Sequence, residues 1–252
     1  MSERVLVTVA AGVLTATLNR PDKRNAIDSA MIDALLAVLD RADLDGEVRV
    51  VALRGAGADF CAGMDLGELL ASADHPIDRN RDAALRFGAI FLRMRALPKP
   101  VVAVVQGRVL AGGCGLATGC DLVLAAESAQ FGYPEVQRGF VPAIVLTMLR
   151  RAVGEKIAFD LAATGRLLDA TEAATVGLVS RVYEDTDFEE QVGDVLRALA
   201  AASPTALALT KQQFYQLEGL SFEEGIRLGA DVNAVSRTTP DFRAALTAFL
   251  KK

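Results

Sequence analysis

Three short apolar runs, rich in β-branched residues, constrain the fold of this chain more than any other feature. They span Val48–Leu53, Val101–Val105 and Leu122–Ala126, and runs of this length are typical of strands buried on both faces of a sheet. A segment with helical character, Arg81–Arg95, ends before Pro98 and separates the first two runs. Strands that alternate with helices in this order predict a parallel sheet with right-handed crossovers. We therefore expect the first two-thirds of the chain to be α/β.

The N-terminal segment predicts a strand pair followed by a helix. Residues Val5–Leu18 alternate in polarity around Ala11-Gly12, a pattern typical of a β-hairpin. After this segment, either Asp28 or Ser29 can cap a helix whose apolar residues fall on one face. This part of the chain is thus expected to supply one hairpin and one amphipathic helix.

From Ala143 onward the pattern is mostly helical. Helices are predicted near Ala143–Val153, Phe188–Ala201, Thr205–Leu217, Phe222–Val235 and Phe242–Leu250. The last of them carries an apolar stripe, formed by Phe242, Ala245, Leu246 and Phe249. The stripe could pack against the core of the same chain, close over a site as a lid, or contact another subunit.

Charge and composition argue against two classes of function. The 252 residues carry a formal net charge of −5, whereas nucleic-acid binding depends on clustered Lys and Arg. The segment Met1–Val9 lacks the apolar stretch of a signal peptide, and no later run of about 20 apolar residues could span a bilayer. We therefore expect a cytoplasmic protein with neither a nucleic-acid nor a membrane partner.

The cysteines and the single histidine argue against metal and triad chemistry. Cys61, Cys114 and Cys120 form no metal-ligand pattern with His75, so no metal site is predicted. Three such cysteines suit a reducing compartment better than a disulfide framework. His75 lies in a polar stretch, Ser72–Arg81, that we expect to form a loop. A solvated histidine in a loop is a poor member of a Ser-His-Asp triad.

Two loops that follow predicted strands are the best candidates for chemistry. The first is Phe60–Leu66, in which Gly63 lets the backbone turn and leave an N–H group unpaired. The second is Gln106–Leu116, which contains Gly112-Gly113 and is expected to open a helix with free N–H donors. Donors from both loops could converge on one oxygen atom and stabilise an oxyanion. Judged on glycine content alone, tight turns and close helix–sheet packing explain these residues better, and a G-x-G-x-x-G dinucleotide spacing is lacking.

Four ordered motifs resemble those of the crotonase (enoyl-CoA hydratase/isomerase) superfamily. They are Leu18-Asn19-Arg20-Pro21 with Asn25-Ala26, Cys61–Leu66, Gly107–Cys120 running into Asp121, and Gln130–Glu135. Ala173–Val179 and the strand expected after it are also similar to the family, so the resemblance covers nearly the whole chain. The resemblance implies a crotonase-like spiral of ββα repeats over residues 1–195. It also implies a C-terminal helical region over residues 196–252, used for trimerisation or as a lid, and homotrimers that often pair into hexamers.

The resemblance also assigns catalytic roles. The backbone N–H groups of Met64 and Gly112 would be the oxyanion donors. The substrate would be an acyl-CoA thioester of the kind used in fatty acid metabolism, so coenzyme A belongs to the substrate and no separate cofactor is implied. Polarising the thioester carbonyl acidifies the neighbouring carbon and stabilises the enolate that forms. Glu135 would then be the acid/base, with Pro134 fixing the chain before it and burial raising its pKa.

The same motifs imply a set of substrate-binding residues. This set consists of Lys23, Arg24, Ala26, Ala62, Asp65, Leu66, Gly113 and Pro134. Lys23 and Arg24 lie in the segment where relatives approach the nucleotide half of coenzyme A, and Lys or Arg suits phosphate recognition. A solvated turn explains the two cations equally well.

One position departs from the family pattern. Many hydratases of the family carry a second glutamate directly after the residue matching Cys114, and this sequence has Gly115 there. Asp65, Glu68 and Asp121 are near in sequence, but helix capping or solvent exposure explains each of them as well. The usual pair of carboxylates is therefore missing.

A single carboxylate leaves three alternatives for the function. Glu135 could add water to a 2-enoyl-CoA, which we favour because Pro134–Ala143 resembles the matching stretch of one-glutamate bacterial hydratases. It could instead move a proton from C2 to C4 through a dienolate, which is the reaction of a Δ3,Δ2-enoyl-CoA isomerase. The third alternative is a non-catalytic acyl-CoA-binding protein.

Overall fold

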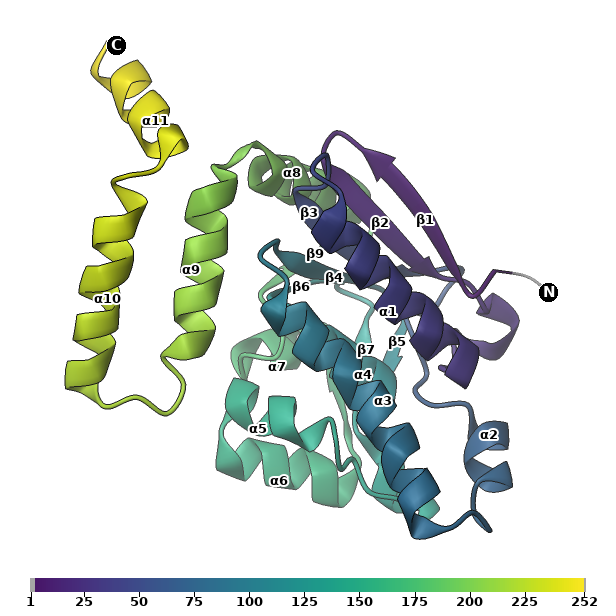
Figure 1. Ribbon diagram of the computed structural model, residues 1–252. Helices are drawn as coiled ribbons and strands as arrows, with labels where there is room; N and C mark the ends of the chain where they lie inside the picture. The colour runs from purple at the N-terminus through teal and green to yellow at the C-terminus, as the bar shows by residue number, and fades with distance from the viewer. Residues whose placement is uncertain (1–2, 252) are drawn as a thin grey trace.

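The computed structural model describes residues 3–251 and contains two β-sheets with helices packed around them (Figure 1). The six-stranded main sheet has the order β1-β2-β3-β4-β6-β9, and the second sheet has the order β5-β7-β8. The main sheet consists of β1 (Val5–Ala10), β2 (Val13–Leu18), β3 (Val50–Gly55), β4 (Val101–Val105), β6 (Leu122–Ala126) and β9 (Arg181–Tyr183). The second consists of β5 (Arg108–Leu110), β7 (Gln130–Gly132) and β8 (Leu167–Asp169).

Eleven α-helices are assigned among the described residues. They are α1 (Ser29–Leu44), α2 (Leu66–Ala71), α3 (Ile77–Ala96), α4 (Gly112–Thr118), α5 (Leu146–Val153), α6 (Glu155–Thr164), α7 (Ala170–Thr175), α8 (Phe188–Ala201), α9 (Pro204–Gln216), α10 (Phe222–Ser236) and α11 (Pro240–Leu250). Two short 3₁₀ turns, Pro21–Lys23 and Pro134–Arg138, precede Arg24 and Gly139, which both have left-handed backbone angles. Together with the two sheets, these helices form the α/β fold that the sequence predicts.

The N-terminal predictions are confirmed. β1 and β2 pair antiparallel around Ala11-Gly12, and the later pairs of the main sheet are parallel. Asp28 is the N-cap of α1, because its side chain accepts a hydrogen bond from the Met31 N–H at 2.8 Å.

Both faces of the central strands are buried, as their unbroken apolar sequence indicates. Val51 and Leu53 of β3 belong to the larger hydrophobic core, which α1 and α3 also line. Val50 and Ala52 point to the other face and pack in a second core with Phe188 of α8. Successive residues of a strand face opposite sides of the sheet, so a strand covered by helices on both faces needs apolar residues throughout.

The predictions at residues 72–81 and at Ala143 are wrong. The stretch Ser72–Arg81 is not a loop over its whole length, because α3 begins at Ile77 directly after Pro76, which has the extended angles of an N-cap residue. The polar residues of this stretch lie on the exposed side of the helix, so they do not interrupt it. His75 does lie in the preceding turn, where it is half-buried. Ala143 lies in a turn before α5, which begins only at Leu146.

The C-terminal helices differ from the rest of the fold. α8 begins and ends at the predicted residues, and α9, α10 and α11 lie within two residues of their predicted bounds. Figure 1 shows α10 and α11 (yellow) standing away from the two sheets, and neither has a buried residue. The expected division after residue 195 falls inside α8 and stays a prediction.

No single helix within residues 3–251 has the length and apolar composition needed to cross a membrane. α8 and α9 meet those two criteria only when taken as a pair, and they are bent by 100° relative to each other.

Candidate active site

The two glycine-containing loops begin at the carboxyl ends of neighbouring strands. β3 ends at Gly55 and leads into residues 56–65, while β4 ends at Val105 and leads through Gly107 into β5 and α4. Because β3 and β4 pair in parallel, both loops leave the same edge of the main sheet. Open α/β sheets bind ligands at this edge. The fold therefore brings the two predicted loops together.

A parallel β-bridge ties the first loop to β5. The Cys61 N–H donates to the Arg108 carbonyl oxygen at 3.0 Å, and the Cys61 carbonyl accepts from the Leu110 N–H at 2.9 Å. The approach continues into α4, since a Cβ atom on Gly113 would lie 2.4 Å from the Cys61 carbonyl oxygen. A side chain at position 113 would thus push the two loops apart.

Gly63 marks a second close contact between the loops. Its φ of 101° lies in the left-handed region that favours glycine. A Cβ atom there would lie 2.8 Å from the Ala111 Cβ atom and 3.3 Å from the Gly112 backbone nitrogen. The residue before Met64 therefore lies directly against the second predicted amide.

The Met64 peptide is fixed on both sides while its own N–H stays unpaired. Ile27 donates to the Gly63 carbonyl and accepts from the Asp65 N–H, each at 2.8 Å. The Met64 N–H finds no protein acceptor within residues 3–251. A backbone donor held in this way can bind a ligand oxygen without prior rearrangement.

Gly112 is the first residue of α4, so its N–H has no acceptor inside the helix. The preceding residue, Ala111, has φ 51° and ψ −125°, a conformation that costs a non-glycine residue about 1–3 kcal/mol. A hydrogen bond of 2.8 Å from the Ala111 N–H to the Gly132 carbonyl holds it in place. The fold thus maintains a strained residue immediately before the free amide.

Glu135 lies in the 3₁₀ turn Pro134–Arg138 and is only 8% exposed. Its Oε2 atom is buried and has no hydrogen-bond partner among the described residues. Burial raises the pKa of Glu135 above its ordinary value, and the nearby Arg138 opposes this shift. A buried carboxyl with a free oxygen atom and a raised pKa is a candidate proton carrier.

The pairing of β7 with β5 brings the Glu135 turn towards α4. Gly132 at the end of β7 lies opposite Leu110 of β5, and Glu135 follows three positions later. Burial is the largest cause that raises the pKa of Cys114 in α4 to about 12, and the charge of Glu135 acts in the same direction. The carboxyl and the Gly112 amide therefore belong to neighbouring segments.

Comparison with known proteins decides the family. Residues 8–252 match the family model described as enoyl-CoA hydratase/isomerase. The chain belongs to the enoyl-CoA hydratase/isomerase family. The resemblance seen in the sequence motifs is thereby confirmed across nearly the whole chain.

Relatives with a described activity cover the full length of this family member. A Thermus thermophilus protein, provisionally named an enoyl-CoA hydratase, is 42% identical over 98% of both chains. The 2,3-dehydroadipyl-CoA hydratase of Escherichia coli K12 is 33% identical over 100% of this chain and 97% of the relative. The 1,2-epoxyphenylacetyl-CoA isomerase of the same organism is 32% identical with the same coverage. A solved enoyl-CoA hydratase of Mycobacterium smegmatis superimposes with a TM-score of 0.94 at 31% identity, over 99% of this chain and 97% of the other.

In this enoyl-CoA hydratase/isomerase family member, Val145 fills the space beside Gly115. A Cβ atom on Gly115 would lie 2.0 Å from the Val145 Cγ1 atom and 2.7 Å from its Cβ atom. Val145 is 3% exposed and packs in the larger core. A glutamate side chain cannot enter at position 115 unless Val145 moves. The packing around Gly115 is therefore consistent with the absence of a second carboxylate.

The nearby acidic residues have structural partners. Asp65 caps α2 through the Gly67 N–H at 2.9 Å and pairs with Arg20 at 2.9 Å. Burial acts to raise the pKa of Asp65, but hydrogen bonds from Arg20 and the α2 amides outweigh it and lower the pKa. Glu68 accepts from the Ser29 N–H at 2.9 Å. Asp121 accepts from the Val101 N–H at 2.7 Å, so all three are explained by structure, an alternative that the sequence analysis kept open.

The predicted cationic residues lie on an exposed turn beside the first loop. Lys23 and Arg24 are both exposed, and Arg24 forms only a 3.9 Å ion pair with Asp59. The buried side chain of Asn25 holds the turn, because its amide donates to the carbonyls of Ala56 and Asp59 at 2.9 and 2.8 Å. The turn is thus tied to the first loop at its base and exposes two cations at its surface.

The remaining predicted binding residues lie on the same segments. Ala26 and Ala62 are half-buried on neighbouring loop segments. A hydrogen bond of 2.9 Å from the Ala62 N–H to the Arg24 carbonyl joins these segments. Leu66 is exposed at the start of α2, whereas Gly113 and Pro134 are buried. Their contact with a substrate stays a prediction.

Sequence reasoning missed Val145 and Tyr133. Val145 lies far along the chain from Gly115, so no local pattern could link the two. Tyr133 is fully buried and lies 2.8 Å through its hydroxyl from the Thr118 hydroxyl. Its place two residues before Glu135 was the only available signal.

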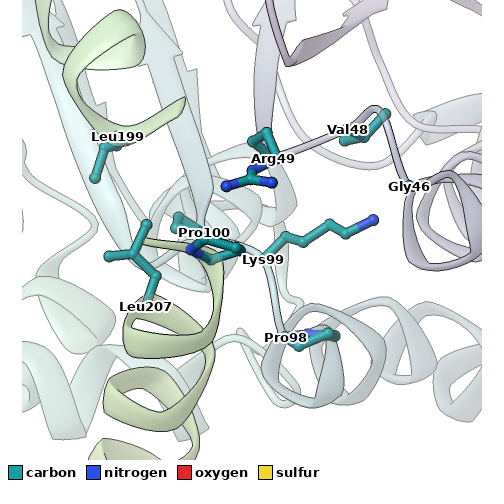
Figure 2. A pocket seen from close by; sticks show the side chains of 9 residues that line it. Gly46, Val48, Arg49, Pro98, Lys99, Pro100, Leu199 and Leu207 are labelled. Atoms are coloured by element: carbon teal, nitrogen blue, oxygen red, sulfur yellow. The ribbon is translucent and has the colours of Figure 1, made fainter. Parts of the chain in front are cut away.

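A small cavity lies away from these loops (Figure 2). It has a volume of about 110 Å³ and lies between the turns at Gly46–Arg49 and Pro98–Pro100 and the helix residues Leu199 and Leu207. Those turns precede β3 and β4, whereas the site loops follow these strands. The cavity is therefore at the opposite edge of the main sheet from the candidate site.

Proposed function

We propose that this protein is an acyl-CoA enzyme of the enoyl-CoA hydratase type, with Glu135 as its acid/base. The observation that carries the proposal is the buried Glu135 carboxyl, whose Oε2 atom has no protein partner within residues 3–251. The Met64 and Gly112 amides would bind the thioester oxygen and stabilise the enolate. Family membership supports the substrate class, since both named E. coli relatives act on CoA thioesters by their descriptions.

The proposed reaction adds one water molecule across the C2=C3 bond of a 2-enoyl-CoA. The Glu135 carboxylate removes a proton from water while the water oxygen bonds to C3, and negative charge moves to the thioester oxygen. The enolate then collapses as C2 takes the proton from the Glu135 carboxyl. A raised pKa suits this cycle, because the same group must both accept and release a proton near neutral pH.

The replacement of Glu135 by Gln tests this assignment directly. Glu135→Gln keeps the size of the side chain but removes its proton-carrying ability, so turnover should fall on the order of 10²-fold or more. The assay uses crotonyl-CoA, branched 2-enoyl-CoAs and 3-enoyl-CoAs with the purified full-length protein. Glu127→Gln is the matched control, since Glu127 is an exposed glutamate. Full turnover in Glu135→Gln would remove Glu135 from the mechanism.

Double-bond isomerisation is the second candidate, and the contact between Gly115 and Val145 favours it. With that space filled by an apolar side chain, no second carboxylate is present at position 115 to share the activation of water. Glu135 alone could carry a proton between C2 and C4 of a 3-enoyl-CoA. Turnover in H₂¹⁸O separates the reactions, because hydration incorporates solvent oxygen and isomerisation does not. A product without label, formed with exchange at C2 and C4, would favour isomerisation over hydration.

We also propose that Lys23 and Arg24 bind the phosphates of coenzyme A.

We further propose that the helices of residues 196–252 form a homotrimer or a dimer of trimers. The exposed side chains of Phe222, Ile226 and Phe249 support an interface there. Native mass spectrometry would give the number of subunits, and a monomer at micromolar concentration would contradict the proposal.

A further inference from the structure

Tyr133 connects the two halves of the candidate site. Its side chain is fully buried at the end of β7, two residues before Glu135. Its hydroxyl lies 2.8 Å from the Thr118 hydroxyl in the last turn of α4, the helix that begins with Gly112. One buried hydrogen bond thus joins the turn that carries the carboxyl to the helix that carries the amide.

The direction of this hydrogen bond follows from the protons available. The Thr118 hydroxyl has one hydrogen atom and donates it to the Cys114 carbonyl at 2.8 Å within α4. Thr118 can then only accept from Tyr133, so the Tyr133 hydroxyl is the donor. Burial raises the pKa of Tyr133 well above its ordinary value, which is consistent with a phenol that donates.

The other contacts of the Glu135 turn lead away from α4. The Gln137 side-chain amide donates to the Thr164 and Gly165 carbonyls at 3.3 and 3.1 Å, at the end of α6. Towards α4, the Tyr133 hydroxyl bonds to the Thr118 hydroxyl and also lies beside the Cys114 thiol. The turn is therefore held from two sides, and on the side of α4 the Tyr133 hydroxyl adds to the hydrogen bond from the Ala111 N–H to the Gly132 carbonyl.

We propose that Tyr133 is a positioning residue that fixes the distance between the Glu135 carboxyl and the Gly112 amide. The proposal rests on the acid/base role proposed for Glu135. Without the Tyr133 hydroxyl, the chain keeps the hydrogen bond from the Ala111 N–H to the Gly132 carbonyl and the contacts with α6. The residues after Gly132 lose their hydroxyl hydrogen bond to α4, so the Glu135 carboxyl can shift. A carboxyl displaced by about 1 Å from the reacting carbons can lose on the order of 10²-fold in rate.

The test compares two tyrosine variants of the protein. Tyr133→Phe should lower kcat on the order of 10-fold or more while KM changes less than about 2-fold, because the oxyanion amides are kept. Tyr215→Phe is the control, since the half-buried Tyr215 donates its hydroxyl to Asp121 at 2.7 Å outside the site. Both variants should lower the melting temperature by similar amounts, but Tyr215→Phe should keep the wild-type kcat.

Thr118 supplies a conservative rescue. Thr118→Ser keeps a hydroxyl acceptor for Tyr133 and should retain wild-type kcat, whereas Thr118→Val removes the acceptor and should reproduce the loss seen in Tyr133→Phe. A purely structural role for the pair would lower stability in Thr118→Val without changing kcat.

The pKa of Glu135 gives a readout that needs no substrate. The titratable and charged groups acting with Glu135 are Arg138 of its own turn, Cys114 of α4 and Tyr133. A carboxyl released from α4 becomes better solvated, so its pKa should fall in Tyr133→Phe and the acidic limb of the pH–rate profile should move to lower pH. Carbon-13 NMR of glutamate-labelled protein measures this pKa, with the Glu135 signal assigned by its loss in Glu135→Gln.

The outcomes separate this proposal from the proposed function. Unchanged kcat and an unchanged Glu135 pKa in Tyr133→Phe, beside an inactive Glu135→Gln variant, would overturn the positioning role alone. Full activity in Glu135→Gln would overturn the acid/base role and the positioning role with it.

Discussion

The site loops and the last two helices are built in opposite ways. In the site, a methyl group on Gly63 would collide with the Ala111 Cβ atom, and one on Gly113 would collide with the Cys61 carbonyl oxygen. In α10 and α11 no residue is buried, and Phe222 and Phe249 are 88% and 74% exposed. The fold of one chain therefore specifies the geometry of the site, but this fold leaves the apolar faces of the C-terminal helices exposed.

The attachment of α9 to the core provides the first test of this comparison. Lys211 is the buried residue of α9, and its ammonium group donates to the Met94 carbonyl at 2.7 Å and the Lys99 carbonyl at 2.9 Å and pairs with Asp121 at 2.7 Å. Lys211→Met would leave the Asp121 carboxylate without its cation, so the free energy of unfolding should fall by about 3–5 kcal/mol. Urea denaturation measures this change.

An exposed ion pair of α10 provides the control for the Lys211 experiment. Arg227 and Glu223 are about three-quarters exposed, and Arg227→Met should change the free energy of unfolding by less than about 1 kcal/mol. Equal effects of the two substitutions would contradict the view that α9 is fixed by a buried cation.

A methyl group at Gly63 tests the close contact between the loops. Gly63→Ala should lower stability by about 2–4 kcal/mol, since it adds overpacking against Ala111 to the cost of a left-handed alanine. Turnover should fall on the order of 10²-fold, because the Met64 and Gly112 amides are pushed apart. Steady-state kinetics and urea denaturation measure the two effects.

Gly219 is the matched glycine in the C-terminal region. Its φ is also positive, at 84°, but a Cβ atom there would meet nothing within 4 Å. Gly219→Ala should therefore cost only about 1–2 kcal/mol and leave turnover unchanged. If both alanine variants kept full turnover, the contact at Gly63 would not control the site.

The burial of Glu135 predicts a smaller effect that depends on pH. Its folded-state pKa is raised above the ordinary value of 4.5, so the favourable protonated form is present at low pH and is lost as the pH rises through the folded-state pKa. Above that pKa the buried charge opposes folding. Glu135→Gln should therefore melt at a higher temperature than the wild type at pH 8, and the gain should disappear as the pH falls towards 4.5. A gain that is constant with pH would contradict the raised pKa.

The sequence predicted the helices and strands that are long enough to show an apolar run or a helical period. The runs at Val101–Val105 and Leu122–Ala126 became β4 and β6 with the predicted bounds, and Phe188–Ala201 became α8. The strands of the second sheet have only three residues each, too few to show a period, so they were missed. Val48 was placed in a strand because it is apolar, but its N–H bonds to the Asp45 carbonyl in the turn before β3.

The sequence predicted the residues of the candidate site but not the contacts between them. Family motifs pointed to Met64, Gly112 and Glu135, but only the fold shows that Gly63 touches Ala111 and that the Glu135 Oε2 atom is unpaired. These are contacts between segments distant in sequence, which no local pattern encodes. Val145 was not predicted for the same reason, since it is distant in sequence from Gly115. A Cβ atom at position 115 would collide with its side chain.

A crystal structure of the Glu135→Gln variant with a bound 2-enoyl-CoA tests the central claim most directly. The quantities to measure are the distances from the thioester oxygen to the backbone nitrogen atoms of Met64 and Gly112. The account predicts that both are about 2.7–3.1 Å, with the side chain at position 135 facing C2 and C3. A thioester oxygen bound elsewhere, with either amide paired to a protein acceptor, would contradict it.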